Sequence, residues 1–354
     1  MSQDRQIENV DVRLGPSHDP IPATRAAGVN RYARPLESLG VAVDLLLADA
    51  SIPGELLECP EALVPLDRAF KFAELACRAV GSEHLALHLG FRPSLDEYGS
   101  YGELIKKSLT VYEYLRKGVS LYNLLITGQR LWLTRHGDQF RLNLATAGDH
   151  DLGSYQSHIE SVATTIAILR HSLGPYWTPK EICLAYRSRE NLPESDLFDN
   201  SLIMRGSDIT YMTIPAEMMK RAFRDDGTVT ASAPESNAAR SIPQNLEGLV
   251  QFQIESLLSS GKLHIDTVAE SMMMSRRTLQ RRLAEQHETY SHLLSEIRFK
   301  IAARKLANSD QAIAEIAFEL GYGDASNFTR AFRQKTGVSP LYFRTTSADG
   351  YRIH

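Results

Sequence analysis

A short segment near the C-terminus carries side chains suited to reading nucleic-acid bases. Arg276, Arg277, Gln280 and Arg281 follow one another closely, and no acidic residue interrupts 275–284. Arginine forms paired hydrogen bonds with guanine edges in the major groove, and glutamine forms them with adenine edges. The residue types therefore predict a surface that recognises DNA sequence.

A second segment, about fifty residues further on, carries a different polar set. Ser326, Asn327, Thr329 and Arg330 would project from a helix that is otherwise apolar on one side. These shorter groups suit phosphate contacts, water-mediated contacts and thymine methyl groups. We predict that this segment also binds DNA, with less direct base reading than the first.

The two segments belong to an internal repeat that resembles a helix-turn-helix in each copy. Each copy has a small residue, a tight turn, an N-cap residue and an apolar pair four residues apart. The corresponding residues are Ala269, Met273, Ser275 and Leu279/Leu283 in the first copy, and Ala317, Gly321, Asp324 and Phe328/Phe332 in the second. A single copy could be only a solvated basic helix face. Two copies in register favour DNA binding.

A long helix is predicted between the two copies, at 291–307. Leu294, Ile297 and Ile301 form its expected apolar stripe. Its length is about 25 Å at 1.5 Å per residue, which would place two recognition helices about one DNA turn apart. After the second copy, Gly337 ends a helix, and Ser339-Pro340 begins another as N-cap and first residue.

This C-terminal region resembles the AraC-type (AraC/XylS) bacterial transcription regulators. The sequence IAFELGYGDASNFTRAFRQKTGVSPLYFR at 316–344 resembles the family motif, and SRRTLQRRLAEQ at 275–286 resembles its first recognition helix. The likeness covers about 248–345. It implies an all-α domain of seven helices, with two helix-turn-helix units joined by a long helix.

The resemblance also implies roles for individual residues. The base-reading positions correspond to Arg277, Gln280 and Arg281 in the first unit, and to Ser326, Thr329 and Arg330 in the second. Arg298 matches a frequent arginine of the linking helix, with a structural or a phosphate-binding role. The run 272–274, Met-Met-Met, departs from the family pattern and is interpreted as core packing, because methionine fills irregular gaps.

The N-terminal part has mixed periodicity, which indicates a helical subdomain followed by an α+β layer. The predicted helices are 31–47, 65–80, 103–126, 154–173 and 215–223, the last with Pro215 in its first turn; the predicted strands form a hairpin at 130–145 and lie at 181–187 and 208–214. Gly174-Pro175 should end the helix at 154–173.

Two phrases of this part, 21–41 and 79–90, resemble the front domain of the ornithine- and arginine-utilisation regulators within the same family. The resemblance implies a sensor that binds a small-molecule effector and forms a homodimer. The glycine-rich, acidic pattern of a jelly-roll arabinose pocket is missing, so the helical plus α+β sensor is favoured. The residues that would bind the effector are unknown at this level.

Composition and charge divide the chain into three parts. We expect an effector-sensing and dimerisation domain at 20–223, a flexible linker rich in Ala, Ser, Pro, Asp and Gly at 224–246, and a DNA-binding domain at 247–345. The formal charge is −6 for residues 1–240 and +2 for 241–345. Such asymmetry is typical of a chain with two tasks.

Several classes of protein are disfavoured by the sequence. The start of the chain lacks the apolar segment of a signal peptide, and no apolar run is long enough to span a membrane. Cys59, Cys77 and Cys183 are widely spaced, which indicates reduced thiols in a cytoplasm. Nucleophile-elbow and Walker motifs are missing. We therefore expect no cofactor and no enzymatic activity.

Two motifs could bind a ligand but have a simpler interpretation. Glu83-His84-x3-His88 places two imidazoles at a metal-binding spacing, but no third ligand is evident, so we expect a surface or half-buried pair and no metal. Asp49-x-Ser51-x-x-Gly54 fits a DxSxxG pattern of some cyclic-dinucleotide sensors. Its companion arginines, Arg31 and Arg34, have the wrong spacing, so a structural turn is favoured.

Aromatic residues crowd one stretch of the front part. They are Tyr98, Tyr101, Tyr112, Tyr114, Tyr122, Trp132 and Phe140. They could line an apolar ligand pocket, although core packing is the more frequent role of such residues.

The sequence as a whole predicts a cytoplasmic, nucleoid-associated bacterial transcription regulator, in which activation is favoured over repression by resemblance. Its expected partners are promoter DNA, an unidentified effector, a second copy of the chain and RNA polymerase. Two alternatives stay open at this point. One is an enzyme-like front domain attached to a DNA anchor, and the other is an architectural DNA-binding protein without sequence preference.

Overall fold

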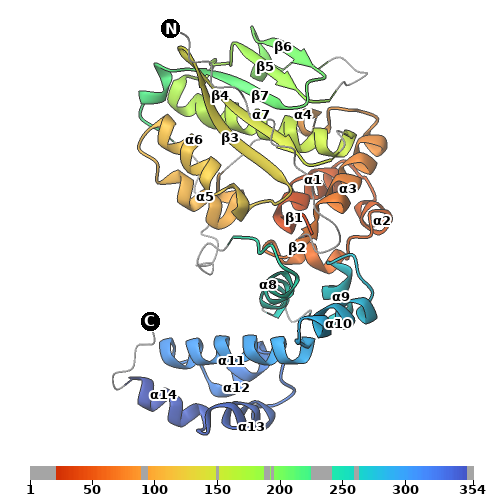
Figure 1. Cartoon of the computed structure of the whole chain (residues 1–354), viewed down its shortest axis with the longest axis vertical. Helices are drawn as coiled ribbons and strands as arrows, with labels where there is room; N and C mark the ends of the chain where they lie inside the picture. The colour runs from red at the N-terminus through yellow and green to blue at the C-terminus, as the bar shows by residue number, and fades with distance from the viewer. Residues whose placement is uncertain are drawn as a thin grey trace.

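The computed structural model describes residues 21–88, 95–148, 151–186, 192, 195–224, 241–258 and 263–348. It has a front domain of mixed helices and strands, and a C-terminal domain made of helices (Figure 1). A multidomain chain with an α+β front part and a helical C-terminal part is thereby confirmed.

The front domain is organised around one five-stranded sheet. Its strands are β3 (Gln129–His136), β4 (Gln139–Thr146), β5 (Glu181–Leu184), β6 (Leu202–Arg205) and β7 (Thr210–Pro215), in the order β3-β4-β7-β5-β6. All neighbouring pairs are antiparallel except β5 and β6, which are parallel. The predicted hairpin is confirmed, and Gly137 supplies the left-handed backbone of its turn, with φ of 61°.

The longest helix of the front domain, α7 (Leu152–Leu173), packs against β5, β7 and the helix α3 (Leu66–Val80). The Asp151 carboxylate caps its first turn by accepting a hydrogen bond from Ser154 N at 2.7 Å, and Gly174 follows its last residue. A second, two-stranded sheet pairs β1 (Ala23–Arg25) with β2 (Leu63–Pro65). The remaining elements are α1 (Ala26–Ser38), α2 (Val43–Asp49), η1 (Gly54–Glu58), α4 (Leu85–His88), η2 (Leu95–Tyr98), α5 (Gly99–Lys106), α6 (Val111–Ser120), η3 (Tyr122–Leu124), η4 (Asp196–Phe198) and η5 (Met218–Lys220).

Three of the predicted helices differ in the structure. The helix predicted at 31–47 is divided at Gly40, which has φ of 78°. The helix predicted at 103–126 is divided where Thr110 caps α6 by accepting a hydrogen bond from Glu113 N at 3.1 Å. The prediction at 215–223 was wrong, because Pro215 is the last residue of β7, and only the single turn η5 follows.

The C-terminal domain contains α8 (Leu246–Leu258), α9 (Ile265–Glu270), α10 (Arg276–Glu285), α11 (Tyr290–Asn308), α12 (Ile313–Glu319), α13 (Ala325–Thr336) and α14 (Pro340–Ala348). The long helix predicted between the repeats is α11. Its fully buried residues are Leu293, Ile297, Ala302 and Leu306. Leu294 and Ile301 are only partly buried. The predicted apolar stripe is therefore correct at Ile297 and wrong by one residue at the other two positions, where Leu293 and Ala302 are buried instead.

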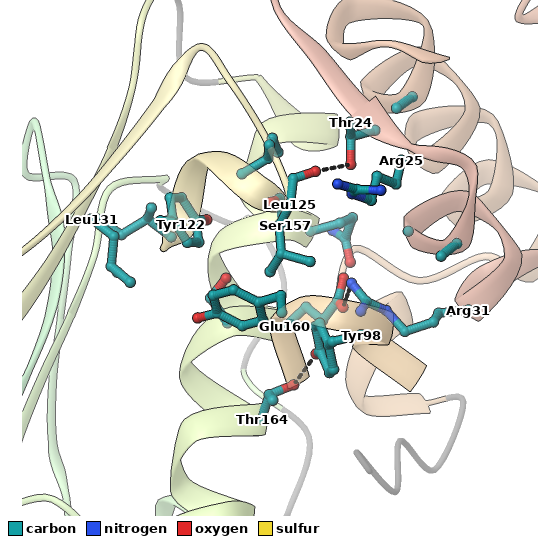
Figure 2. Close-up of a pocket in the computed structure, with 18 of the residues that line it drawn as sticks. Thr24, Arg25, Arg31, Tyr98, Tyr122, Leu125, Leu131, Ser157, Glu160 and Thr164 are labelled. Carbon is teal, nitrogen blue, oxygen red and sulfur yellow. Dashed lines mark hydrogen bonds and ion pairs between the residues drawn. The ribbon is translucent and has the colours of Figure 1, made fainter. Parts of the chain in front are cut away.

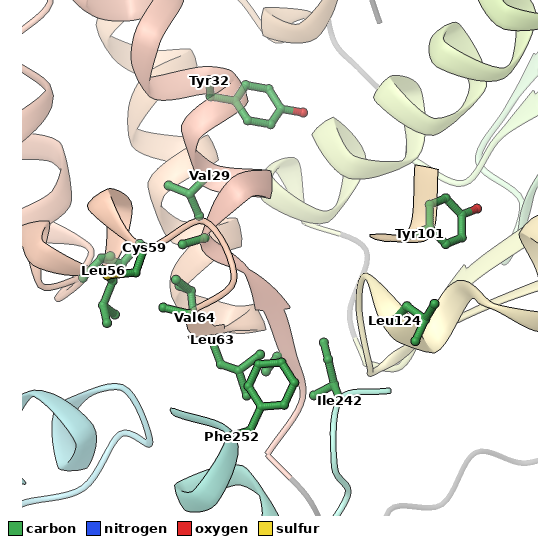
Figure 3. Close-up of a cluster of buried hydrophobic side chains, with 14 of the residues drawn as sticks. Val29, Tyr32, Leu56, Cys59, Leu63, Val64, Tyr101, Leu124, Ile242 and Phe252 are labelled. Atoms are coloured by element: carbon green, nitrogen blue, oxygen red, sulfur yellow. The ribbon is translucent and has the colours of Figure 1, made fainter. Parts of the chain in front are cut away.

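The two domains are joined by contacts of α8 with the β1–β2 ribbon. Phe252 and Gln253 of α8 are buried, and the amide of Gln253 bonds the main chain of Leu63. Figure 3 shows Phe252, Leu63 and Ile242 at this junction. Ile242 is 2% exposed, and its N–H donates to the Asn123 carbonyl at 3.1 Å. Most of the predicted linker, residues 225–240, lies outside the described residues.

Candidate nucleic-acid interface and buried cavity

The first half of the repeat forms the helix pair α9 and α10. Ser275 caps α10 by accepting a hydrogen bond from Thr278 N at 3.2 Å, as predicted. Leu279 and Leu283 are fully buried on its inner side. In the turn, Met272 and Met274 are buried, whereas Met273 is 47% exposed with φ of 56°. The core-packing interpretation of this run is thus wrong for Met273, which occupies the left-handed position of the turn.

The four candidate side chains of α10, Arg276, Arg277, Gln280 and Arg281, are all exposed. Two of the arginines contact acidic residues. Arg281 Nη1 donates to Glu285 Oε1 at 2.8 Å, and Arg276 Nη1 lies 4.0 Å from Asp266 Oδ2. Because these ion pairs are exposed, each stabilises the free protein by about 1 kcal/mol at most. The two arginines can therefore exchange these partners for another anionic group at little cost.

The second half of the repeat forms the helix pair α12 and α13. The Asp324 carboxylate caps α13 by accepting hydrogen bonds from both Asn327 N and Asn327 Nδ2, each at 2.7 Å. Asn327 Oδ1 in turn accepts one from Arg330 Nη2 at 2.7 Å. The capping residue and two candidate side chains thus form one chain of hydrogen bonds.

An open depression lies on the outer side of α13. It is lined by Ala325, Ser326, Thr329, Arg330, Arg333 and Gln334. Ser326, Asn327 and Arg330 are exposed, and Thr329 is half-buried. The structure thus places three of the four α13 candidates, Ser326, Thr329 and Arg330, on one surface. It adds Arg333 and Gln334, which sequence reasoning missed although both are one turn further along the same helix.

Arg298 of α11 has a structural contact with the turn before α13. Its Nη2 donates to the Gly321 carbonyl at 3.1 Å, and its guanidinium carbon lies 4.7 Å from the centroid of the Tyr322 ring. Gly321 has φ of 70°, so it supplies the left-handed residue predicted for this turn. Of the two roles considered for Arg298, the structural one is observed here.

A cavity of about 160 Å³ lies inside the front domain. Its wall is formed by α1, α3, α7, the aromatic segment 98–122 and the inner face of β3, β4 and β7. Most of the lining is apolar, with Phe70, Phe72, Leu142 and Met212 among its residues. A mainly apolar space with a few polar groups is typical of a small-molecule site.

The polar side of the cavity is built around Glu160 of α7 (Figure 2). Glu160 Oε1 forms an ion pair with Arg31 Nη2 at 2.5 Å. Glu160 Oε2 accepts a hydrogen bond from the Tyr32 hydroxyl at 2.6 Å. Burial, and then the charge of Glu160, raise the pKa of the Tyr32 hydroxyl well above its ordinary value. Beside this group, the Tyr98 ring lies 4.2 Å from the Arg31 guanidinium carbon, and its hydroxyl is 3.3 Å from Thr164 Oγ1.

Arg25, at the end of β1, connects the cavity with the C-terminal domain. Its side chain lines the cavity, forms an ion pair with Glu61 and donates to the Leu124 carbonyl. Its guanidinium carbon also lies 5.3 Å from the centroid of the Phe252 ring in α8. Burial lowers the pKa of Arg25 to about 10, so the side chain stays charged at neutral pH.

The crowded aromatic residues divide between two roles. Tyr98, Tyr101, Tyr114 and Tyr122 line the cavity, and the last three are also buried in the core, so both roles considered for this group are observed. Tyr112 is 44% exposed and packs edge-on against Phe140 instead. Burial raises the pKa of Tyr101 and of Tyr122 above the ordinary value for tyrosine.

Two other motifs are structural in the described residues. His84 is fully buried, which corrects the expected surface or half-buried position, and its Nδ1 lies 2.8 Å from the Tyr155 hydroxyl. The side chain of His88 lies outside the described residues. Ser51 has φ of 56° between α2 and η1, so the Asp49–Gly54 segment is the expected turn. Its presumed companion Arg31 faces the cavity instead.

Sequence reasoning missed the charged groups of the cavity. Glu160 lies within an apolar helix, and Arg25 and Arg31 lie far from it in the sequence. An acidic residue on the otherwise apolar inner face of 154–173 was the available signal, because a buried carboxylate requires a partner. The cavity also supplies what the sequence left unknown, a set of residues able to hold an effector.

Comparisons with known proteins identify both domains. Residues 268–346 match a family model described as "Helix-turn-helix domain". Residues 40–223, half of the chain, match one described as "Arabinose-binding domain of AraC transcription regulator, N-term". The name of this model does not imply a jelly roll here, since the matched residues form the helical plus α+β arrangement.

Curated relatives agree with these models. The ornithine utilization regulator of Pseudomonas aeruginosa is 24% identical over 312 residues, covering 86% of this chain and 91% of that protein. The regulator VirS of Mycobacterium tuberculosis is 35% identical over 88 residues, 25% of this chain and 26% of that protein. The solved structure of the transcriptional regulator CdpR from P. aeruginosa is 21% identical and covers 88% of this chain and 97% of that one, with a TM-score of 0.36.

Among the described residues, no helix combines the length and the apolar character that a bilayer span requires. The full-length curated match and the models for both domains agree on one class of protein. The chain belongs to the AraC family of transcription regulators, with an N-terminal effector-binding domain and a C-terminal helix-turn-helix DNA-binding domain.

Proposed function

We propose that this regulator recognises promoter DNA through the exposed faces of α10 and α13. The observation that carries this is the set of exposed side chains on α10, where three arginines and a glutamine surround the N-terminal half of a capped helix. Arg277, Gln280 and Arg281 read base edges, and Arg276 contacts phosphate. Ser326, Asn327, Thr329 and Arg330 of α13 make the second, more water-mediated contact.

The buried cavity is, in this proposal, the effector site. Arg25 supports a route from the cavity to DNA, because it lines the cavity and also contacts Phe252 of α8. An effector that displaces Arg25 would change how α8 is held, and α8 packs against both α9 and α11. Control then requires that the effector bind the two arrangements with different affinity.

Further parts of the proposal follow from the family. The protein acts as a homodimer in the bacterial cytoplasm, on the nucleoid, and activates transcription by contacting RNA polymerase. It is a regulator and not an enzyme, a reading supported by relatives that are transcription regulators. In this proposal the front domain, residues 20–223, binds the effector and forms the dimer. A linker at 224–246 connects it with the DNA-binding domain at 247–345.

The decisive experiment selects bound sequences from randomised double-stranded DNA, using the full chain at fixed salt. We expect the wild-type protein to enrich a defined motif. Arg281→Ala should cost about 1–3 kcal/mol on that motif and relax one base position. Arg282→Ala removes the same charge from the flank of α10 and should weaken binding equally for all sequences. A uniform loss with Arg281→Ala, or no motif for the wild type, would overturn the proposal.

A further inference from the structure

The charged groups of the cavity come in pairs of opposite sign. Arg31 is paired with Glu160, and Arg25 with Glu61. Among the described lining residues, these four are the charged ones, so the lining carries no net charge. The lining therefore offers no surplus charge that would balance the charge of an ionic ligand. This feature separates the cavity from sites that capture a carboxylate with an unpaired arginine.

The carboxylate of Glu160 lies at the centre of the polar end of the cavity. Both of its oxygens already have a partner, Arg31 on one side and Tyr32 on the other. Its side chain is 7% exposed, and that of Arg31 is 16% exposed. A ligand carboxylate at this place would be repelled by Glu160, and an ammonium group by Arg31. Taking one partner away would leave a buried charge uncompensated, which is strongly unfavourable.

An uncharged hydroxyl or carbonyl group meets neither repulsion. A hydroxyl can accept a hydrogen bond from Arg31 or Tyr98 and donate one to Glu160 or Thr164, all of which line the cavity. The ion pair then stays intact. The remaining wall is apolar and aromatic, with Phe72, Ile105 and Leu142 among its residues, so the rest of the ligand must be apolar as well.

The size of the cavity limits the ligand further. Its volume is about 160 Å³, close to that of apolar protein cavities of about 150 Å³ that take up one benzene molecule. The space thus fits a compact ring or a short branched chain with one small polar group. A sugar would bring several hydroxyls to a mainly apolar wall and leave most of them without partners.

From these observations we propose that the cavity takes an uncharged, compact, mainly apolar molecule bearing one hydroxyl or carbonyl group. The Arg31–Glu160 pair acts as a charge filter, by which we mean that Glu160 repels anionic ligands and Arg31 repels cationic ones. This inference rests on the proposed function only in calling the ligand an effector. It differs from what the names of the matching family model and of the full-length relative suggest, a sugar and an amino acid.

The test uses three probes of one shape that differ in charge: benzyl alcohol, benzoate and benzylamine, which is protonated at pH 7. L-Arabinose and L-ornithine are included as the alternative classes. Dissociation constants for the full chain are measured by calorimetry or ligand-observed NMR. We expect benzyl alcohol to bind at least tenfold more tightly than either ion and than the sugar or amino acid. Tighter binding of any of these four, or no binding of benzyl alcohol, would overturn the proposal.

Variants of the Arg31–Glu160 pair test the charge selectivity of ligand binding, which would not change if the pair had only a structural role. Glu160→Gln leaves Arg31 without its carboxylate and should raise benzoate affinity at least tenfold. Arg31→Met should do the same for benzylammonium. The double variant removes both charges, avoids an uncompensated one and should keep the preference for the alcohol. Arg34→Met and Glu37→Gln, exposed on the same α1 helix, are the matched controls and should change nothing.

The outcomes are separable from those of the proposed function. Charge selectivity is measured on the ligand, without DNA. If the single variants do not shift selectivity toward the expected ion, the charge filter is wrong whatever the DNA experiment gives. If Arg281→Ala weakens binding to all sequences equally, the proposed base reading is wrong and the ligand class is unaffected.

Discussion

The side-chain amide of Gln253 in α8 forms two hydrogen bonds with the main chain of Leu63 in β2. Leu63 N donates to Gln253 Oε1 at 2.7 Å, and Gln253 Nε2 donates to the Leu63 carbonyl at 3.3 Å. Both residues are fully buried. The amide thus occupies the place that a neighbouring strand would take beside β2, and it fixes α8, the first helix of the C-terminal domain, to the β1–β2 ribbon of the front domain.

Replacing Gln253 should therefore weaken the junction of the two domains. Gln253→Met keeps a similar volume but leaves the N–H and the carbonyl of Leu63 without partners. We expect the free energy of unfolding to fall by about 2–4 kcal/mol, since each unsatisfied buried group costs about 1–3 kcal/mol. Urea denaturation measures this, and hydrogen exchange at the Leu63 amide should become faster. Gln251→Met, on the same helix, serves as the control. Equal losses in the two variants would contradict the assignment.

The turn before α10 carries backbone strain that glycine would relieve. Met273 has φ of 56°, a conformation that is unfavourable for side chains other than glycine. Its side chain is 47% exposed, so little packing is lost on removal. Met273→Gly should raise the free energy of unfolding by up to about 1 kcal/mol, after the greater freedom of glycine in the unfolded chain is subtracted.

The equivalent turn before α13 provides the reverse experiment. Gly321 has φ of 70°, and a Cβ there would lie 3.1 Å from Arg298 Nη2. Gly321→Ala should lower stability by about 1 kcal/mol or more. Thermal or urea unfolding of both variants checks the pair. If Met273→Gly were destabilising, its side chain would have a packing role that its exposure does not indicate.

The crossing of α3 and α7 depends on Gly153. A Cβ at this position would lie 2.2 Å from the Phe70 carbonyl oxygen, a main-chain atom that cannot turn away. Gly153→Ala should force the two helices apart and lower the free energy of unfolding by about 2–3 kcal/mol, within the range for overpacked sites. Gly54→Ala, where a Cβ meets nothing within 4 Å, is the control. Calorimetry of both variants distinguishes helix spacing from a general effect of alanine.

Alkaline pH should destabilise the front domain through its cavity tyrosines. The pKa values of Tyr32, Tyr101 and Tyr122 are raised by burial above the ordinary 10.0. Because the folded state favours the neutral phenols, their contribution to stability is complete below pH 10 and is lost as the pH rises above it. Each tyrosine can make the free energy of unfolding fall by up to about 1.4 kcal/mol for each pH unit above 10.

The variant Tyr101→Phe isolates one of these groups. Its hydroxyl donates only a long hydrogen bond of 3.3 Å to the Gly118 carbonyl, so phenylalanine should be tolerated. The dependence of unfolding free energy on pH, measured from pH 8 to about 11, should be less steep in this variant. The exposed Tyr112→Phe should leave the slope unchanged. An unchanged slope for Tyr101→Phe would show that its hydroxyl ionises equally in both states.

Local patterns were sufficient to predict the helices that carry the side chains proposed to bind DNA. The caps Ser275 and Asp324 and the buried pair Leu279/Leu283 act within one or two helical turns, so a short stretch of sequence contains all the information needed. The β3–β4 hairpin is equally local. The prediction failed at 215–223, where Pro215 pairs with Gln139 as the last residue of β7 and does not begin a helix.

The cavity could not be predicted in the same way. The pairs Arg31–Glu160 and Arg25–Phe252 join residues on different elements that only the tertiary fold brings together. Their types are also ambiguous, because an isolated arginine or glutamate is most often solvated. The tyrosines were found as a group, but whether they filled a core or lined a space depended on the position of α7.

The burial of α8 between the two domains also limits how regulators of this type can be recombined. A DNA-binding fragment cut at the predicted linker would expose Phe252 and the amide of Gln253, and one cut after α8 would lose the partner of α9 and α11. When sensor domains are exchanged between such proteins, α8 and the β1–β2 ribbon that it covers must therefore come from the same parent protein. Chimeras joined within α8 should lose effector control even when both halves fold.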